Sequence, residues 1–192
     1  MAEIVAAFWA RFLSDPVVMV GGVTEIVTER LGLRRFVETD RQAVVDIHRD
    51  PETNRYNPHP PDTATTLVMF DSWLEHWATF GYGYLAVRER GRPAATDGSD
   101  VIGMTGVRNR EFRGEKVLNL AYRFRPSAWG KGYAAEAARA AVEWAEREMS
   151  AVPVLISVSV TNTPSLRVVE KLGFREYVEE EYEGAVSRHF RR

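Results

Sequence analysis

The strongest chemical signal in the sequence is a loop with two glycines, Trp129-Gly130-Lys131-Gly132, which lies between a predicted strand and a predicted helix. Glycines at such a point let the backbone turn tightly and come close to a ligand. The start of the following helix offers unpaired N–H donors and a positive dipole end, which suits a phosphate group. Lys131 adds a positive charge. The same two glycines are also compatible with a plain strand-to-helix turn.

Two nucleotide-binding patterns fit this loop poorly. A P-loop has Gly five positions before its Gly-Lys pair and Ser or Thr after the Lys, but Arg125 and Gly132 occupy those places. The segment 130–135 fits a loose dinucleotide fingerprint, which expects a carboxylate about 20 positions further on. The next predicted strand, residues 154–160, is followed by Thr-Asn and no carboxylate.

A second polar segment, Asn162-Thr163-Pro164-Ser165, follows that strand and opens a short helix. Thr163 is the predicted helix cap, Pro164 suits the first helical position, and Gly173 ends the helix. Two successive helices therefore start at the same end of adjacent strands. The glycine loop and the Asn162 segment are expected at one edge of a sheet.

Hydrophobic periodicity and turn residues predict the elements that position these segments. A strand at 31–37 precedes a capping box at 39–42 and a helix, and prolines make 50–62 a loop. A helix follows, with apolar residues spaced from 67 to 77 and a stop at Gly81. The remaining predicted elements are a hairpin of strands 84–90 and 101–107, a polar connection at 108–115, a strand at 117–124, a helix at 134–149 and a final hairpin at 174–192.

Length and composition indicate one globular domain. The chain has 192 residues, of which 45% are hydrophobic, enough to bury a sizeable core. We expect a main domain over residues 23–192 and a helical appendage over residues 1–22, separated by a break that contains Pro16 and paired glycines.

Charge and cysteine content exclude several classes of function. The 25 Lys and Arg against 27 Asp and Glu give a net charge of −2, so no global field attracts nucleic acid or a membrane surface. No apolar run approaches the ~20 residues that span a bilayer, and no signal peptide is evident, so a cytoplasmic protein is expected. The absence of cysteine excludes thiolate nucleophiles, and the four histidines lack metal-ligand spacing, so no metal is expected.

Four motifs and their order along the chain are informative together: DPETNRY at 50–56, Ile-Gly at 102–103, WGKGYAAEA at 129–137 and NTPSLRVVEKLGF at 162–174. Together they resemble the GNAT superfamily of acetyl-CoA-dependent N-acetyltransferases, specifically the branch typified by ribosomal-protein N-terminal acetyltransferases. The resemblance spans about residues 31–192. It implies an α/β (α+β) fold with a central twisted mixed β-sheet flanked by helices, in which two parallel central strands splay apart.

The resemblance also implies that acetyl-CoA is the cosubstrate and which residues bind it. The family's phosphate-loop pattern falls on Trp129, Gly130, Lys131, Gly132, Tyr133 and Ala134. Trp129 departs from the pattern at its first position, which should cost little because such loops bind through backbone N–H groups. The backbone at Phe124 and Arg125 and the side chain of Asn162 would lie beside the pantetheine arm.

In this family an amine attacks the thioester directly in a ternary complex, which requires a neutral amine and a proton for the departing thiolate. The Tyr that other branches use as proton donor falls at Val169, so the resemblance implies Ser165 as the donor. The alternative role of Ser165 is a polar residue at a helix start. Asn119 stands where this branch often has Glu, and an amide cannot accept a proton at neutral pH. The general base therefore stays open.

Weaker candidates for the base are Glu111 and Glu115. His59, in the proline-rich loop, is a candidate for approaching the substrate, with placement on the surface as the alternative. By resemblance, Tyr56, Asn57 and Trp73, and more remotely Tyr82, are candidates for the acceptor wall, although Trp73 also fits a core position and Asn57 a turn. The acidic run at residues 179–183 is expected to be solvated, although it could attract a cationic acceptor.

The predicted function is acetyl transfer to a primary amine, either a protein N-terminus or a small amine, by a monomer or homodimer. The rival is a noncatalytic acyl-CoA-binding or sensing module, which Asn119 keeps open.

Overall fold

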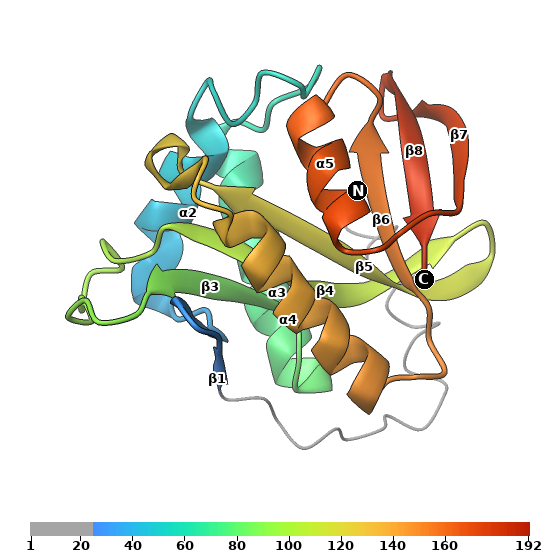
Figure 1. The fold of residues 1–192 in the computed structure, drawn as a ribbon. Helices are drawn as coiled ribbons and strands as arrows, with labels where there is room; N and C mark the ends of the chain where they lie inside the picture. Colours follow the sequence, from blue (N-terminus) through green and yellow to red (C-terminus); the bar gives the residue numbers. More distant parts are fainter. Residues whose placement is uncertain (1–24) are drawn as a thin grey trace.

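The computed structural model describes residues 25–192 and contains one eight-stranded mixed sheet with helices on both faces (Figure 1). The strands run in the order β1-β2-β3-β4-β5-β6-β8-β7. The strands are β1 (Glu25–Val27), β2 (Leu31–Arg35), β3 (Tyr84–Glu89), β4 (Gly103–Phe112), β5 (Glu115–Phe124), β6 (Val154–Ser159), β7 (Tyr177–Tyr182) and β8 (Ala185–Arg191). The predicted α/β class is confirmed. The predicted appendage at residues 1–22 lies outside the described residues.

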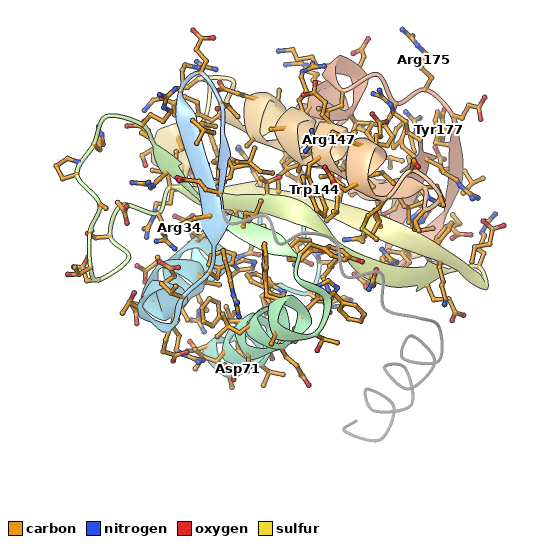
Figure 2. All side chains as sticks on the ribbon, turned by 90° about the horizontal axis from the view of Figure 1, so that it is seen from below. Arg34, Asp71, Trp144, Arg147, Arg175 and Tyr177 are labelled. Atoms are coloured by element: carbon orange, nitrogen blue, oxygen red, sulfur yellow. The ribbon has the colours of Figure 1, made fainter. Side chains whose placement is uncertain are left out.

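Two helices lie on each face of the sheet. Helices α2 (Arg41–Arg49) and α3 (Thr63–Phe80) cover one face, and α4 (Tyr133–Glu148) and α5 (Thr163–Lys171) cover the other (Figure 1). Short 3-10 turns, η1 (Glu38–Asp40) and η2 (Pro126–Ala128), precede α2 and the glycine loop. Side chains fill the space between α4 and the sheet, where Trp144 lies 5.5 Å from the Tyr82 ring, centroid to centroid (Figure 2). No helix within residues 25–192 has the length and apolar character needed to cross a membrane.

Helix α3 begins and ends where its sequence predicts. The Asp62 carboxylate accepts a hydrogen bond from the Thr65 N–H at 2.7 Å, and Gly81 ends the helix with a φ of 73°. The predicted capping box of α2 is wrong. The Asp40 carboxylate instead binds the Arg34 guanidinium and the Val37 N–H, and the Gln42 amide donates to Asp46.

The predicted connection at 108–115 is also wrong, because strands β4 and β5 extend through it and form a long hairpin. Only Arg113 and Gly114 make the turn, with φ angles of 51° and 80°. A left-handed conformation is uncommon for Arg, so the sequence carries no clear signal for this two-residue turn. The polar residues of β4 belong to a strand that lines a cavity rather than to a loop.

The central feature of the sheet is the parallel pair β5 and β6. These strands pair only at Leu118 with Val154 and at Asn119 with Leu155. Beyond these positions β5 continues to Phe124 and β6 to Ser159, and the two strands separate. The splayed parallel strands implied by the resemblance are thereby confirmed.

Candidate active site

A cavity of about 460 Å³, called the splay cavity below, opens where β5 and β6 separate. Its walls include residues 120–123 of β5, residues 156–159 of β6, and Asn162 and Ser165 at the start of α5. The Leu118 N–H points toward β6, where it donates to the Pro153 carbonyl. The Arg125 backbone N–H points the opposite way and donates to the Ile102 carbonyl on the β4 side. Because successive residues alternate in direction, Leu120 and Tyr122 present their backbone groups to the gap. The cavity therefore has a hydrogen-bonding edge for an extended ligand.

The glycine loop lies at the end of β5 and leaves the start of α4 open. Gly130 and Gly132 have φ angles of 76° and 80°, and Gly132 occupies the N-cap position of α4 without a side-chain hydrogen bond to the helix. The first-turn N–H groups are thus available to an anion. The Trp129 indole donates to the Phe124 carbonyl at 2.9 Å, which fixes the loop to the end of β5.

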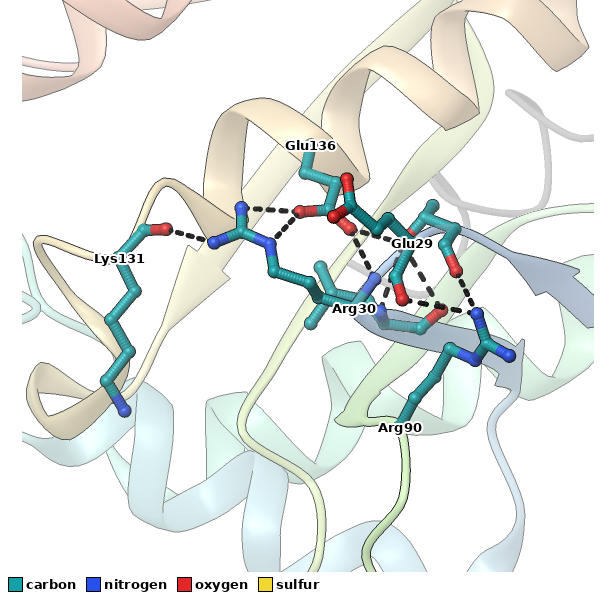
Figure 3. Close-up of polar contacts among 7 residues, drawn as sticks. Glu29, Arg30, Arg90, Lys131 and Glu136 are labelled. Carbon is teal, nitrogen blue, oxygen red and sulfur yellow. Dashed lines mark hydrogen bonds and ion pairs between the residues drawn. The ribbon is translucent and has the colours of Figure 1, made fainter.

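The turn between β1 and β2 supports this loop from outside (Figure 3). Nη1 of Arg30 donates to the Lys131 carbonyl at 2.9 Å, and Nε of Arg30 donates to the Glu136 carboxylate at 2.7 Å. The Lys131 ammonium lies 3.5 Å from the Glu89 carboxylate, so its charge has a protein partner. The sequence did not single out Arg30, because the contact joins residues about a hundred positions apart.

The other predicted cofactor residues lie at the same end of the sheet. Tyr133 and Ala134 form the first turn of α4. The Phe124 carbonyl is occupied by Trp129, and the Arg125 N–H belongs to the sheet, so Leu120 and Tyr122 offer the freer backbone.

The cap of α5 differs from its prediction. Asn162, and not Thr163, is the N-cap residue, and its Oδ1 accepts from the Ser165 N–H at 3.2 Å. The side-chain amide nitrogen of Asn162 is the group that a ligand can use. Ser165 lines the splay cavity, and Val169 is buried in the core behind it.

A tyrosine holds the start of α5 in place. The Tyr122 hydroxyl donates to the Ser165 carbonyl at 3.1 Å. Burial raises the pKa of Tyr122 to about 12, so the phenol stays protonated at neutral pH.

A second cavity, of about 840 Å³, lies on the face covered by α2 and α3. It is bounded by α3, the loop at 57–61 and the turn between β7 and β8. The residues that line both cavities are Asn57, Ala121, Tyr122, Arg123 and Glu183. The two cavities therefore meet at the β5 wall and the β7–β8 turn.

The predicted acceptor residues divide between these cavities. Tyr56 lines the first, Asn57 lines both, and Trp73 lines the second although it is only 3% exposed. Asn57 also has the expected turn role, since its Oδ1 accepts from the His59 N–H at 3.0 Å. Tyr82 lines neither cavity, because it packs in the core beneath α4.

The two glutamates considered as general bases lie away from the cavities, whereas His59, considered only as a residue near the substrate, lies at one of them. Neither Glu111 nor Glu115 lines either cavity, and Glu115 forms an ion pair with Arg191 at 2.6 Å. His59 lines the second cavity. Among residues 25–192, Glu183 is the one carboxylate in the walls of the two cavities, and it belongs to the acidic run at residues 179–183 noted in the sequence.

Asn119 lines the splay cavity, and both the nitrogen and the oxygen of its side-chain amide form hydrogen bonds. Its Nδ2 donates to the Tyr84 hydroxyl at 2.7 Å, and its Oδ1 accepts from Arg110 at 3.0 Å. His48, at the second cavity, uses Nδ1 to contact the Val44 carbonyl. Burial, with a smaller contribution from Arg123, lowers the pKa of His48 to about 4. Within residues 25–192 no three His, Asp or Glu side chains gather in a way that would hold a metal ion.

Comparison with known proteins agrees with this geometry. The family model described as Acetyltransferase (GNAT) domain matches residues 30–175. An N-acetyltransferase of Bacillus subtilis (strain 168) named YnaD is 29% identical over 150 residues, which cover 78% of this chain and 82% of that protein. The crystal structure of an acetyltransferase from Agrobacterium tumefaciens str. C58 is 26% identical with a TM-score of 0.71, and the match covers 89% of this chain and 95% of that one.

A spermidine N-acetyltransferase from Vibrio cholerae, solved in complex with CoA and spermine, shares the fold at 14% identity and a TM-score of 0.62, covering 85% of this chain and 94% of that one. The chain belongs to the GNAT acetyltransferase family. It is an acetyl-CoA-dependent acyltransferase.

Proposed function

We propose that this enzyme transfers acetyl directly from acetyl-CoA to a primary amine while both are bound. The observation that carries the proposal is the meeting of the two cavities at β5. A thioester held in the splay cavity would face an amine held in the cavity beneath α2 and α3. Such proximity converts a bimolecular reaction into an effectively unimolecular one.

The cofactor would be held mainly by backbone groups. The N–H groups at the start of α4 and around Gly130 and Gly132 suit the pyrophosphate. The exposed edge of β5 at Leu120 and Tyr122 suits the amides of pantetheine, and the Asn162 amide nitrogen can donate to the same arm.

Ser165 is proposed as the donor of a proton to the CoA thiolate. Its hydroxyl lies in the first turn of α5 at the wall of the splay cavity. The bond from Tyr122 to the Ser165 carbonyl fixes the backbone of that turn. A positioned donor of this kind typically contributes a factor of about 10² to 10⁴ in rate.

The acceptor is a primary amine, and both a small amine and a protein N-terminus belong to that class. The Vibrio cholerae relative binds spermine, a polycation. Here Arg108, Arg110 and Arg123 line the two cavities against one carboxylate, Glu183, so the wall disfavours a polyamine. The arginines favour an acceptor of lower positive charge.

Two measurements test this function. Calorimetry with acetyl-CoA, CoA and NAD should show binding of the first two and none of NAD. Release of free thiol across a panel of amines and peptides, with mass spectrometry of the products, should then identify acetylated acceptors. Binding without turnover on any acceptor would favour the noncatalytic sensing module, to which the amide at Asn119 also points.

A further inference from the structure

We propose that the acceptor amine also carries a carboxylate and that Arg123 binds it, so that the substrates are small amino-acid-like amines. The inference rests on the proposed function and deepens it. Arg123 lies on β5 and lines both cavities, at the place where they meet.

The Arg123 guanidinium has neutral partners only. Its Nη1 donates to Asn54 Oδ1 at 2.8 Å and lies 3.3 Å from Thr53 Oγ1. No carboxylate of residues 25–192 forms an ion pair with it, whereas Arg34 and Arg41 each contact a carboxylate at 2.7 Å or less. Burial lowers the pKa of Arg123, and no nearby acid counteracts this effect. A partly desolvated cation without a counter-ion is costly, so the site lacks one negative charge.

The free part of the guanidinium suits a carboxylate. Within residues 25–192 the structure records no hydrogen bond from Nε or Nη2 of Arg123, and neither is a buried atom without a partner. A planar guanidinium edge binds carboxylates through two parallel hydrogen bonds. The cavity wall therefore presents a ready-made carboxylate site.

The anion is not expected to be a phosphate of the cofactor. Arg123 contacts the loop that follows α2, while the adjacent Tyr122 reaches α5 on the opposite face of the sheet. Since neighbouring side chains of a strand point to opposite faces, Arg123 belongs to the acceptor side. The phosphate-binding loop leads into α4, on the cofactor side.

Glu183 complements this arrangement. It lines the same two cavities and does not form an ion pair with Arg123. A molecule with an ammonium and a carboxylate would place each group near the opposite charge. This charge pattern favours amino acids over simple amines and over polyamines.

Acetylation of matched acceptors tests the proposal. Free amino acids, the corresponding amino-acid amides, N-terminal peptides with amidated C-termini, and spermidine are compared by thiol release. Amino acids should give a kcat/KM at least about 10-fold above their amides, as expected for one charge-assisted pair. Arg123→Gln should remove that preference by raising KM for amino acids, and Arg123→Lys should restore part of it. Arg49→Gln, at the exposed end of α2, is the control that should change nothing.

A second variant keeps the proposal testable if Arg123→Gln fails to fold. Asn57→Asp is isosteric, keeps the bond that Oδ1 accepts from the His59 N–H, and places a carboxylate in the wall that Arg123 shares, so it should raise KM for amino acids without loss of CoA affinity. Equal turnover of acids and amides, or acetylation only of peptides or polyamines, would overturn this inference and leave amine acetylation intact. No acetylation of any amine would instead overturn the proposed function.

An independent observation concerns the proton that the amine loses. We infer that Ser157 accepts this proton and relays its own to His189. The two residues are paired across β6 and β8, and Ser157 Oγ lies 2.8 Å from His189 Nδ1. Ser157 lines the splay cavity, while His189 is 1% exposed.

The second nitrogen of His189 has no other role in residues 25–192. His189 Nε2 is buried without a hydrogen bond and lies 3.5 Å from the Glu180 carboxylate. With the Ser157 hydroxyl donating to Nδ1, Nε2 carries the hydrogen that faces Glu180. A hydroxyl, an imidazole and a carboxylate in line form a relay that can hold a proton.

Acetyl transfer in this site would move protons through both serines. The amine nitrogen forms a bond to the thioester carbon, its proton moves to Ser157 Oγ, and the Ser157 proton moves to His189 Nδ1. The carbon–sulfur bond then breaks, and the thiolate takes a proton from Ser165. Ser165 regains a proton from solvent in the cavity, and the imidazolium, stabilised by Glu180, returns its proton to solvent through Ser157.

Kinetics distinguish a relay from a structural contact. Ser157→Ala should lower kcat by at least about 10-fold with KM for acetyl-CoA unchanged, and Ser157→Thr should restore most of the rate. The charged groups around His189 are Glu180 on β7, Arg110 on β4 and Arg113 in the β4–β5 turn. Removing one negative charge in Glu180→Gln should move the acidic limb of the kcat profile to lower pH. Full kcat in Ser157→Ala, or an unmoved limb in Glu180→Gln, would overturn the relay.

Discussion

The two faces of the central sheet are built differently. On the face of α4 and α5, the candidate cofactor site consists of glycines, open helix N–H groups and an unpaired strand edge. On the face of α2 and α3, the candidate acceptor site consists of charged, polar and apolar side chains that come from both helices, from three strands, and from the segments at 57–61 and 183–184. A backbone site depends on local conformation, whereas a side-chain site depends on long-range register. Changes on the two faces should therefore have different consequences.

Acid should destabilise the α2 and α3 side most. Burial, followed by a nearby arginine, lowers the pKa of both His48 and His76 to about 4. Both histidines are neutral in the folded protein at neutral pH. Their contribution to the free energy of unfolding is therefore complete above pH 6.5 and is lost as the pH falls toward 4. Each shift corresponds to at most about 3 kcal/mol of unfolding free energy at pH 4.

Urea unfolding at pH 7.5, 5.5 and 4.5 measures this loss, and hydrogen exchange locates it. Exchange in α2 and α3 should rise before exchange in α4. His76→Gln should reduce the pH dependence of stability, and Gln42→Ala, at an exposed position of α2 without a titrating group, should not. Uniform exchange on both faces at pH 5.5 would contradict the assignment.

The cofactor face should respond most to a change in backbone conformation. Gly132→Val places a branched side chain at a φ of 80°, which costs at least about 1–2 kcal/mol or displaces the loop. Calorimetry should show CoA affinity reduced by about 30-fold or more.

Gly114→Val is the matched control for this variant. Its φ is also 80° and its surroundings are open, but it lies in the β4–β5 turn. It should lose similar stability and keep CoA affinity. Equal affinity in both variants would count against the loop as the phosphate site.

Ser165 tests the chemistry at the junction of the faces. Ser165→Ala should lower kcat by at least about 10-fold and leave CoA affinity nearly unchanged, because the hydroxyl acts on the leaving thiolate. Steady-state kinetics provide the measurement, and Thr163→Ala, exposed in the same turn, is the control. Unchanged turnover in Ser165→Ala would leave Ser165 with a structural role alone.

The smallest effect on kinetics is expected from a change in the β7–β8 turn, which bounds the second cavity, the one beneath α2 and α3. A Cβ at Gly184 would lie 2.8 Å from Nε2 of His59, and the residue has a φ of 80°. Gly184→Ala should displace the loop at 57–61 and raise KM for the acceptor a few fold, with KM for acetyl-CoA unchanged.

The equivalent change at Gly114, in the other two-residue turn, should affect neither constant. Adding His59→Ala to Gly184→Ala should recover part of the acceptor KM. A rise in KM for acetyl-CoA instead would show that the turn belongs to the cofactor side.

The difference between the faces also explains what the sequence could predict. The glycine loop, the stop at Gly81 and the splayed strands follow from local patterns and from resemblance, and the structure contains the stop and the splay as predicted. The Arg113–Gly114 turn escaped prediction because Arg gives no signal for a left-handed backbone.

Sites built from side chains were harder to predict because they depend on pairing between distant residues. Ser157 and His189 meet only through the register of β6 with β8. Arg123 and Glu183 share their cavities because β5 and the last hairpin converge there. Local periodicity cannot determine such partners, and the acidic run around Glu183 resembled an ordinary solvated bend.

The contact from Arg30 to the glycine loop has a further consequence. A loop that is ordered only when its ligand arrives must lose conformational entropy at that moment, which weakens binding. Here the guanidinium of Arg30 holds the Lys131 carbonyl and Glu136 together, so the entropy is lost during folding instead. The edge hairpin of the sheet thereby preorganises the loop for its anion.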